Sequence, residues 1–80
     1  MLFEVNLPSL SPTMEEGKIV KWVKKKDEHV LSGEVLFEVE TDKATMEYES
    51  PEDGYIAEIF IDEGSTAKVN QLVALISDNK

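Results

Sequence analysis

Apolar residues in this sequence come in short runs, which acids, glycines and prolines separate. The runs are rich in Val, Ile, Phe and Tyr, and turn-forming residues recur between them at the spacing typical of a β-sandwich or barrel. The only stretch worth testing as a helix, Met14 to Lys26, contains Gly17 and the β-branched pair Ile19-Val20, which disfavour a helix. We therefore predict an all-β fold with strands at Leu2 to Asn6, Lys18 to Val23, Val35 to Val39, Thr45 to Tyr48, Tyr55 to Ile61 and Leu72 to Ile76.

The chain also resembles itself at a shift of 37 residues, which places Gly17 on Gly54. Apolar residues then coincide at most positions where a core would need them, for example Ile19 with Ile56. Coincidence between short strands is one explanation of this match. The other is a flattened barrel or sandwich of two similar antiparallel sheets, packed face to face around a quasi-twofold axis.

The same shift pairs Asp27 with Gly64 and Gly33 with Asn70. Gly, Asn and Asp are the residues that most readily accept positive φ, so these positions are predicted to be turns. The symmetry would place the segment near Lys43 and the C-terminal end of the chain at opposite poles of the domain.

Composition restricts the possible functions. Eighty residues form one domain, 1–80, and the net charge of −9 without any arginine argues against nucleic acid as a partner. The absence of cysteine excludes a disulfide framework, a thiolate metal site and a thiol nucleophile. No apolar run approaches the roughly 20 residues of a membrane helix, so no membrane partner is expected, and the first residues do not read as a signal peptide.

Two predicted strands flank Asp42 and Lys43 and suggest a hairpin. A two-residue loop at these positions pairs Thr41 with Ala44 and extends by alternation to further pairs along both strands. One face of the hairpin is then apolar and the other acidic. The expected pairs are Val39 with Met46, Phe37 with Tyr48 and Glu38 with Glu47, with Glu40 and Glu49 nearby.

Lys43 is unusual for such a turn, because tight hairpins prefer Asn-Gly or Asp-Gly, whose residues accept positive φ. Two interpretations of this lysine remain open. It is either an exposed cation that moderates an acidic segment, or a side chain held at the end of a projecting turn where another protein can reach it.

Several motifs in order resemble the lipoyl domains of the dihydrolipoyl acyltransferase (E2) component of 2-oxo acid dehydrogenase complexes, most like the pyruvate dehydrogenase acetyltransferase type. The resemblance covers nearly the whole chain, and only Asp27 and Asn70 depart from glycines that are common in the family. The motifs are Leu7 to Gly17, Ile19 to Trp22, Glu40-Thr41-Asp42-Lys43-Ala44, Gly54, Glu63-Gly64 and Leu72 to Ile76.

The resemblance implies a quasi-twofold barrel with lipoic acid attached to Lys43, which Asp42 and Ala44 flank. It implies a swinging-arm carrier without catalytic activity of its own, within a longer E2 chain. Its partners would be the E1 decarboxylase, the E2 catalytic domain, the E3 dihydrolipoamide dehydrogenase, and a lipoate ligase or lipoyl/octanoyl transferase. The expected location is the bacterial cytoplasm or the mitochondrial matrix.

Those partners must recognise the tip. The acidic side chains around this turn could be recognised by a partner through their charge. An equally simple explanation of these acids is that they only keep this face hydrated. The loop from Ser9 to Glu15 lies near the lipoyl turn in the family and is a second candidate surface. The candidate recognition residues are Glu40, Asp42, Glu47, Glu49, Ser11, Met14 and Glu15.

Other chemistries have little support. His29 is the sole histidine, no metal site is expected, and the aromatic side chains Trp22, Phe3, Phe37 and Phe60 are predicted to lie in the core. Biotinyl carrier domains share the barrel and the hairpin lysine but typically set the lysine between methionines. A glycine-cleavage H-protein is longer, and an unmodified acidic β adaptor domain is the alternative from a different class.

Overall fold

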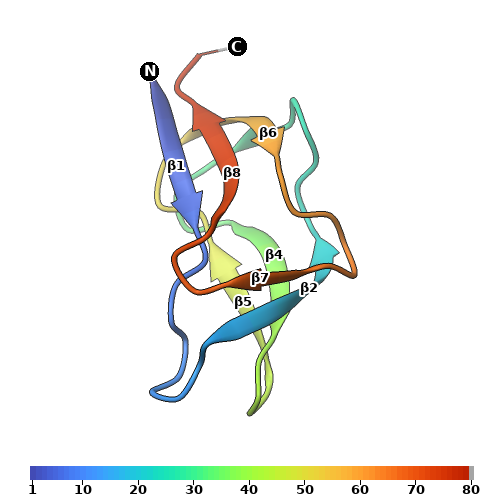
Figure 1. Cartoon of the computed structure of the whole chain (residues 1–80). Coiled ribbons are helices and arrows are strands. Elements are labelled where there is room, and N and C mark those ends of the chain that lie inside the picture. The colour runs from blue at the N-terminus through green and yellow to red at the C-terminus, as the bar shows by residue number, and fades with distance from the viewer. Residues whose placement is uncertain (80) are drawn as a thin grey trace.

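Two four-stranded antiparallel sheets make up the fold in the computed structural model, which describes residues 1–79 (Figure 1). These residues contain no helix, and hence none that could cross a membrane. The molecule is elongated, with principal extents of 36 × 20 × 19 Å. The strands are β1 (Leu2–Asn6), β2 (Glu16–Trp22), β3 (His29–Val30), β4 (Val35–Glu40), β5 (Thr45–Glu49), β6 (Gly54–Ile59), β7 (Thr66–Lys68) and β8 (Leu72–Ser77).

The all-β prediction is confirmed, and each of the six predicted strands is present, with its ends shifted by two residues at most. The segment tested as a helix contains β2 instead. The sequence pattern missed β3 and β7, which are only two and three residues long. Such short strands carry too few side chains to show alternation, so their pairing with β6 and β2 is decided by the rest of the sheet.

The predicted quasi-twofold symmetry is present in the strand order. One sheet has the order β1-β8-β6-β3 and the other β5-β4-β2-β7, so each strand has a counterpart at the same place. The register repeats as well: Lys18 pairs with Glu40 as Tyr55 pairs with Ser77, and both ladders contain a bulge after the next residue. The shift of 37 residues therefore relates two real halves of the structure.

Turn conformations at the repeat positions confirm the prediction from Gly, Asp and Asn. The φ angles are 73° at Asp27 and Asn70, 93° at Gly33 and 88° at Gly64. Two of these turns also join the halves, because the Asp27 amide donates to the Ile56 carbonyl at 2.7 Å and the Gly64 amide donates to the Ile19 carbonyl. Each half thus uses a turn to bind a strand of the other.

The core lies between the two sheets and contains an aromatic row. Phe37 is fully buried, with its ring centroid 4.8 Å from that of Trp22 and 4.9 Å from that of Tyr48. The Trp22 indole N–H donates to the Ile61 carbonyl at 2.8 Å, which satisfies its only polar group. Trp22 and Phe37 thus lie in the core as predicted, and Phe3 packs against it half-buried.

Phe60 does not lie in the core, contrary to the prediction. Its side chain is 49% exposed because it follows the last residue of β6, where the alternation of the strand ends. Its counterpart Val23 follows β2 in the same way and is also exposed. The hydrophobicity of Phe60 suggested burial, but the side chain is exposed because β6 ends one residue before it.

Candidate cofactor-attachment site

The hairpin of β4 and β5 projects at the end of the molecule opposite the two chain termini (Figure 1). The Thr41 amide donates to the Ala44 carbonyl at 2.9 Å, so Asp42 and Lys43 form the two-residue loop that the sequence predicts. The register along the strands is also as predicted, including the apolar pair of Phe37 and Tyr48 and the acidic pair Glu38 and Glu47.

The turn closes without positive φ at either Asp42 or Lys43, so it belongs to neither of the hairpin types that require it. Instead, the Thr41 hydroxyl group holds the loop. Its oxygen accepts from the amides of Lys43 at 3.2 Å and Ala44 at 3.1 Å, and it donates to the Ala44 carbonyl at 2.8 Å. A lysine is tolerated here because a neighbouring side chain supplies the turn chemistry. The sequence reasoning missed this role of Thr41.

Lys43, Asp42 and Ala44 are all exposed at the tip. Within residues 1–79, the Lys43 ammonium group makes no ion pair. A primary amine at the end of a flexible four-carbon stem, free of a local partner, is open to an enzyme that would acylate it. The small Ala44 side chain leaves the approach to this amine uncrowded.

Residues 7–15, which connect β1 to β2, reach the same tip (Figure 1). The Thr13 hydroxyl donates to Asp42 Oδ2 at 2.9 Å, and the Ser11 hydroxyl donates to Asp42 Oδ1 at 3.4 Å. The loop predicted as a second recognition surface therefore touches the turn through the residue beside Lys43. The sequence reasoning missed Thr13, since nothing in the sequence links it to a residue 29 positions away.

Met14 occupies a different place from the other candidate recognition residues. It is buried to 7% exposure, and its sulfur accepts a hydrogen bond from the Leu10 amide at 3.2 Å. A partner cannot contact this side chain in the folded domain, so Met14 anchors the loop from below. Glu15 is exposed, and Ser11 is half-buried against the tip.

Acidic side chains cover the outer face of the hairpin, as the alternation predicts, and Glu40, Glu47 and Glu49 are exposed. Two lysines of β2, which the sequence analysis did not consider, lie alongside. Lys18 pairs with Glu40, and Lys21 pairs with Glu38, which in turn pairs with Glu47. The cation beside them reduces the repulsion between two directly opposed glutamates. A hollow of about 350 Å³ runs beside this face, lined by Glu16, Gly17, Lys18, Glu40, Thr41, Asp42 and Thr66.

The pKa values of Tyr48 and Glu34 depart from their ordinary values. Burial raises the pKa of Tyr48, on the inner face of the hairpin. A hydrogen bond from the Leu31 amide lowers the pKa of Glu34, with a smaller contribution from the Lys24 ammonium. Within the described part of the chain, no group of three or more His, Cys, Asp or Glu side chains is arranged to hold a metal ion. The exposed Lys43 amine is therefore the group at the tip that could be acylated.

A barrel of two sheets with an exposed lysine at the tip of a hairpin is the arrangement expected of a carrier domain. The model of the Biotin_lipoyl family, described as biotin-requiring enzyme, matches residues 3–76. The chain belongs to this family. Within it, the structure is similar to the lipoyl domain of the 2-oxoglutarate dehydrogenase complex from Azotobacter vinelandii, with a TM-score of 0.79 and 31% identity over 96% of this chain and 98% of that one.

Curated relatives favour the lipoyl branch of the family over the biotinyl branch. The chain is 51% identical over 77 residues to the dihydrolipoyllysine-residue acetyltransferase component of the mitochondrial pyruvate dehydrogenase complex of Caenorhabditis elegans. It is 47% identical over 79 residues to the corresponding component of Rickettsia prowazekii. These matches cover 95% and 98% of this chain but only 15% and 19% of the two relatives. The chain is thus a lipoyl-type carrier domain that corresponds to a small part of these proteins.

Proposed function

We propose that Lys43 carries lipoic acid in amide linkage to its Nζ atom and that the domain presents this arm to the enzymes of a pyruvate-type dehydrogenase complex. The observation that carries the proposal is the exposed Lys43 amine at the tip of a two-residue turn, flanked by Asp42 and Ala44, on a lipoyl-type domain. When bound, the lipoyl disulfide supplies a site that accepts an acyl group together with two electrons and later releases both.

Apart from the amide bond at Lys43, the residues of this chain position the arm and leave the acyl-transfer chemistry to other components. Thr41 holds the turn, and β4 and β5 carry this turn to the end of the molecule opposite the two chain termini. Amide formation removes the positive charge of Lys43, so the net charge of the hairpin becomes more negative by one. Tethering to a shared complex makes each active site meet the arm at a raised effective concentration. On this proposal the domain is a non-catalytic part of a longer E2 chain.

The partners on this proposal are the E1 decarboxylase, the E2 catalytic domain, the E3 dihydrolipoamide dehydrogenase, and a lipoate ligase or lipoyl/octanoyl transferase. Such complexes occur in the mitochondrial matrix and the bacterial cytoplasm, where we place this domain. The recognition surface would combine the acids of the hairpin with the exposed part of the 7–15 loop. Its proposed members are Glu40, Asp42, Glu47, Glu49, Ser11 and Glu15.

Mass spectrometry of the intact protein and its peptides tests the attachment. The domain is co-expressed with a lipoate ligase and, separately, with a biotin ligase, and we expect one lipoyl increment on the peptide that contains Lys43. Lys43→Arg should abolish the increment with an unchanged melting temperature, because the charge is kept and only the acylatable amine is lost. Lys68→Arg, at another exposed lysine, is the matched control and should be modified normally.

Each alternative gives a different result in the same experiment. Biotin on Lys43 without lipoylation would indicate a biotinyl carrier domain, whereas no modification by either ligase would indicate an adaptor domain. A large loss of thermal stability in Lys43→Arg would contradict the exposed tip.

A further inference from the structure

The connection between β1 and β2 is the place where the two halves of the domain differ in length. It spans nine residues, 7–15, whereas its counterpart between β5 and β6 spans four, 50–53. Both connections begin alike, because the Leu7 amide donates to the Gln71 carbonyl as the Ser50 amide donates to the Glu34 carbonyl. Four residues are enough to join the equivalent strands in the other half, so the additional length is not required to span this gap, although Leu10 and Met14 within it also pack into the core.

The additional residues bring two hydroxyl groups to the tip. Thr13 and Ser11 donate to the two carboxylate oxygens of Asp42 at 2.9 and 3.4 Å. Closer to β2, the loop is held by the buried Met14, whose sulfur accepts from the Leu10 amide and whose own amide donates to the Ser11 carbonyl at 3.2 Å. The crest of the loop is therefore attached to the hairpin, while its base is attached to the core.

The Asp42 carboxylate does not help to close its own turn. Thr41 makes the bonds to the amides of Lys43 and Ala44, and within residues 1–79 the Asp42 oxygens bond only to Ser11 and Thr13. A hydroxyl-to-carboxylate bond is charge-assisted and stronger than a neutral one. The side chain next to Lys43 is thus dedicated to the contact between loop and hairpin.

We propose that Thr13, with Ser11 as a weaker second donor, is a positioning residue that holds the 7–15 loop and the Lys43 hairpin in one fixed arrangement through Asp42. This proposal rests on the proposed function and deepens it, because a partner that contacts both segments then meets a preformed surface. Without the Thr13 hydroxyl, the partner must order the two segments when it binds, which weakens binding without changing the chemistry at the arm.

The first test needs no cofactor. In the unmodified domain, Thr13→Val should increase hydrogen exchange and fast backbone motion of the amides of residues 9–15, and Thr13→Ser, which keeps the hydroxyl, should restore wild-type values. Thr66→Val is the matched control, since Thr66 is exposed in the hollow that Asp42 also lines but makes no bond to Asp42 in the described part of the chain. Unchanged loop amides in Thr13→Val would overturn the proposal.

The second test uses lipoylated domains and an E1 decarboxylase that reductively acetylates the wild type. Thr13→Val should raise the KM for the domain roughly threefold to tenfold, as expected for the loss of one solvent-exposed hydrogen bond, with kcat unchanged. Equal KM values, a decrease confined to kcat, or a Thr13→Ser variant as impaired as Thr13→Val would overturn the proposal. A wild-type domain that no ligase lipoylates would instead refute the proposed function, and the exchange measurement would still decide the role of Thr13.

Discussion

At one end of the domain the chain turns from β4 into β5 at Asp42 and Lys43, and at the other end β8 and β1 meet at the equivalent positions. The backbone plan is the same, because the Thr41 amide donates to Ala44 at 2.9 Å and the Asp78 amide donates to Met1 at 3.2 Å. We call the turn from Thr41 to Ala44 the hairpin pole, and the meeting of β8 and β1 at Asp78 and Met1 the terminal pole. The terminal pole serves as an internal reference for the hairpin pole.

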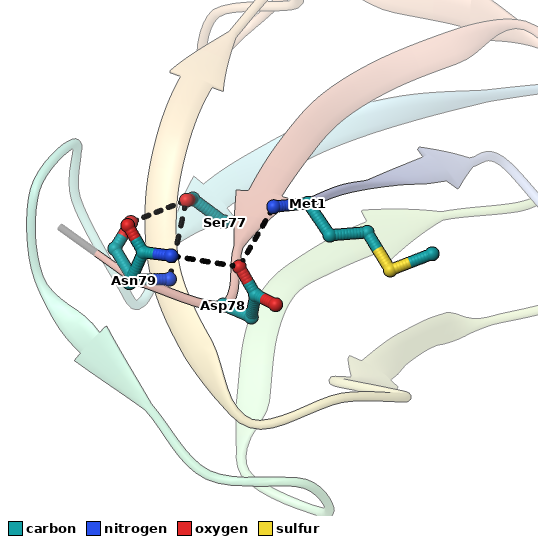
Figure 2. Close-up of polar contacts among 4 residues, drawn as sticks. All are labelled: Met1, Ser77, Asp78 and Asn79. Atoms are coloured by element: carbon teal, nitrogen blue, oxygen red, sulfur yellow. Dashed lines mark hydrogen bonds and ion pairs between the residues drawn. The ribbon is translucent and has the colours of Figure 1, made fainter.

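The side chains at the two poles differ. Figure 2 shows polar contacts between the strand ends at the terminal pole: the Met1 amine lies 2.9 Å from Asp78 Oδ1, and the Asn79 amide group donates to the same carboxylate at 3.3 Å. At the hairpin pole, Asp42 instead contacts a separate loop. Duplication of the framework explains the barrel, and the side chains of one pole distinguish the candidate site from its symmetric copy.

The largest difference between the halves is expected at the equivalent glycines. A Cβ atom on Gly54 would lie 2.3 Å from the Ser77 carbonyl oxygen, and φ there is 158°, so Gly54→Ala should cost about 3 kcal/mol or more of unfolding free energy. A Cβ atom on Gly17 would lie 2.5 Å from a methyl group of the buried Val39; a side-chain contact is relieved at lower cost than a backbone contact, so Gly17→Ala should cost about 1–2 kcal/mol. Urea denaturation measures both.

Gly33→Ala is the control for backbone strain alone, because φ is 93° and no atom lies within 4 Å of the added carbon. It should cost about 1 kcal/mol. Equal losses for Gly17→Ala and Gly54→Ala would show that the halves tolerate the added methyl group alike, contrary to this comparison.

An intermediate effect is expected at the hairpin turn. Thr41→Val removes the hydroxyl that bonds the Lys43 and Ala44 amides, so the unfolding free energy should fall by about 1 kcal/mol and these two amides should exchange faster. Thr45→Val, on the adjacent exposed strand, is the control and should change stability by less than about 0.5 kcal/mol. Protected amides in Thr41→Val would mean that the turn closes without the hydroxyl.

The smallest effect is expected at the terminal pole and depends on pH. The Met1 ammonium donates a hydrogen bond to Asp78 and lowers the pKa of this carboxyl below its ordinary value of 3.8. Because the folded-state pKa is depressed, the contact stabilises the fold above pH 3.8 and is lost as the pH falls through the folded-state value. Asp78→Asn should lower the melting temperature at pH 6 by at most about two degrees, since the pair is exposed, and this difference should vanish in acid.

Acetylation of the Met1 amine provides the control for this prediction. It should lower the melting temperature as Asp78→Asn does, and the two changes together should have no larger effect than either alone. A difference between wild type and Asp78→Asn that persists at pH 2 would exclude the ionised carboxylate as its cause.

The sequence by itself determined the features that depend on local pattern. Alternation predicted six strands and the register of Phe37 with Tyr48, and the shift of 37 residues predicted two related halves. Turn positions such as Asp27 and Asn70 followed from the few residue types that accept positive φ. The hairpin tip at Lys43 was predictable for a different reason: the two strands that form the hairpin are adjacent in the sequence, so their alternation fixes the turn between them.

Only the tertiary structure decided which distant segments meet. It set β3 and β7 against longer strands, brought Lys18 and Lys21 beside the acids of β4, and buried Met14 beneath its loop. It also joined Thr13 to Asp42 across 29 residues. These contacts depend on how two sheets pack and on the length of one connection, which no periodicity along the chain records. The sequence therefore determined the barrel and its lysine, and the packing of the sheets decided what surrounds that lysine.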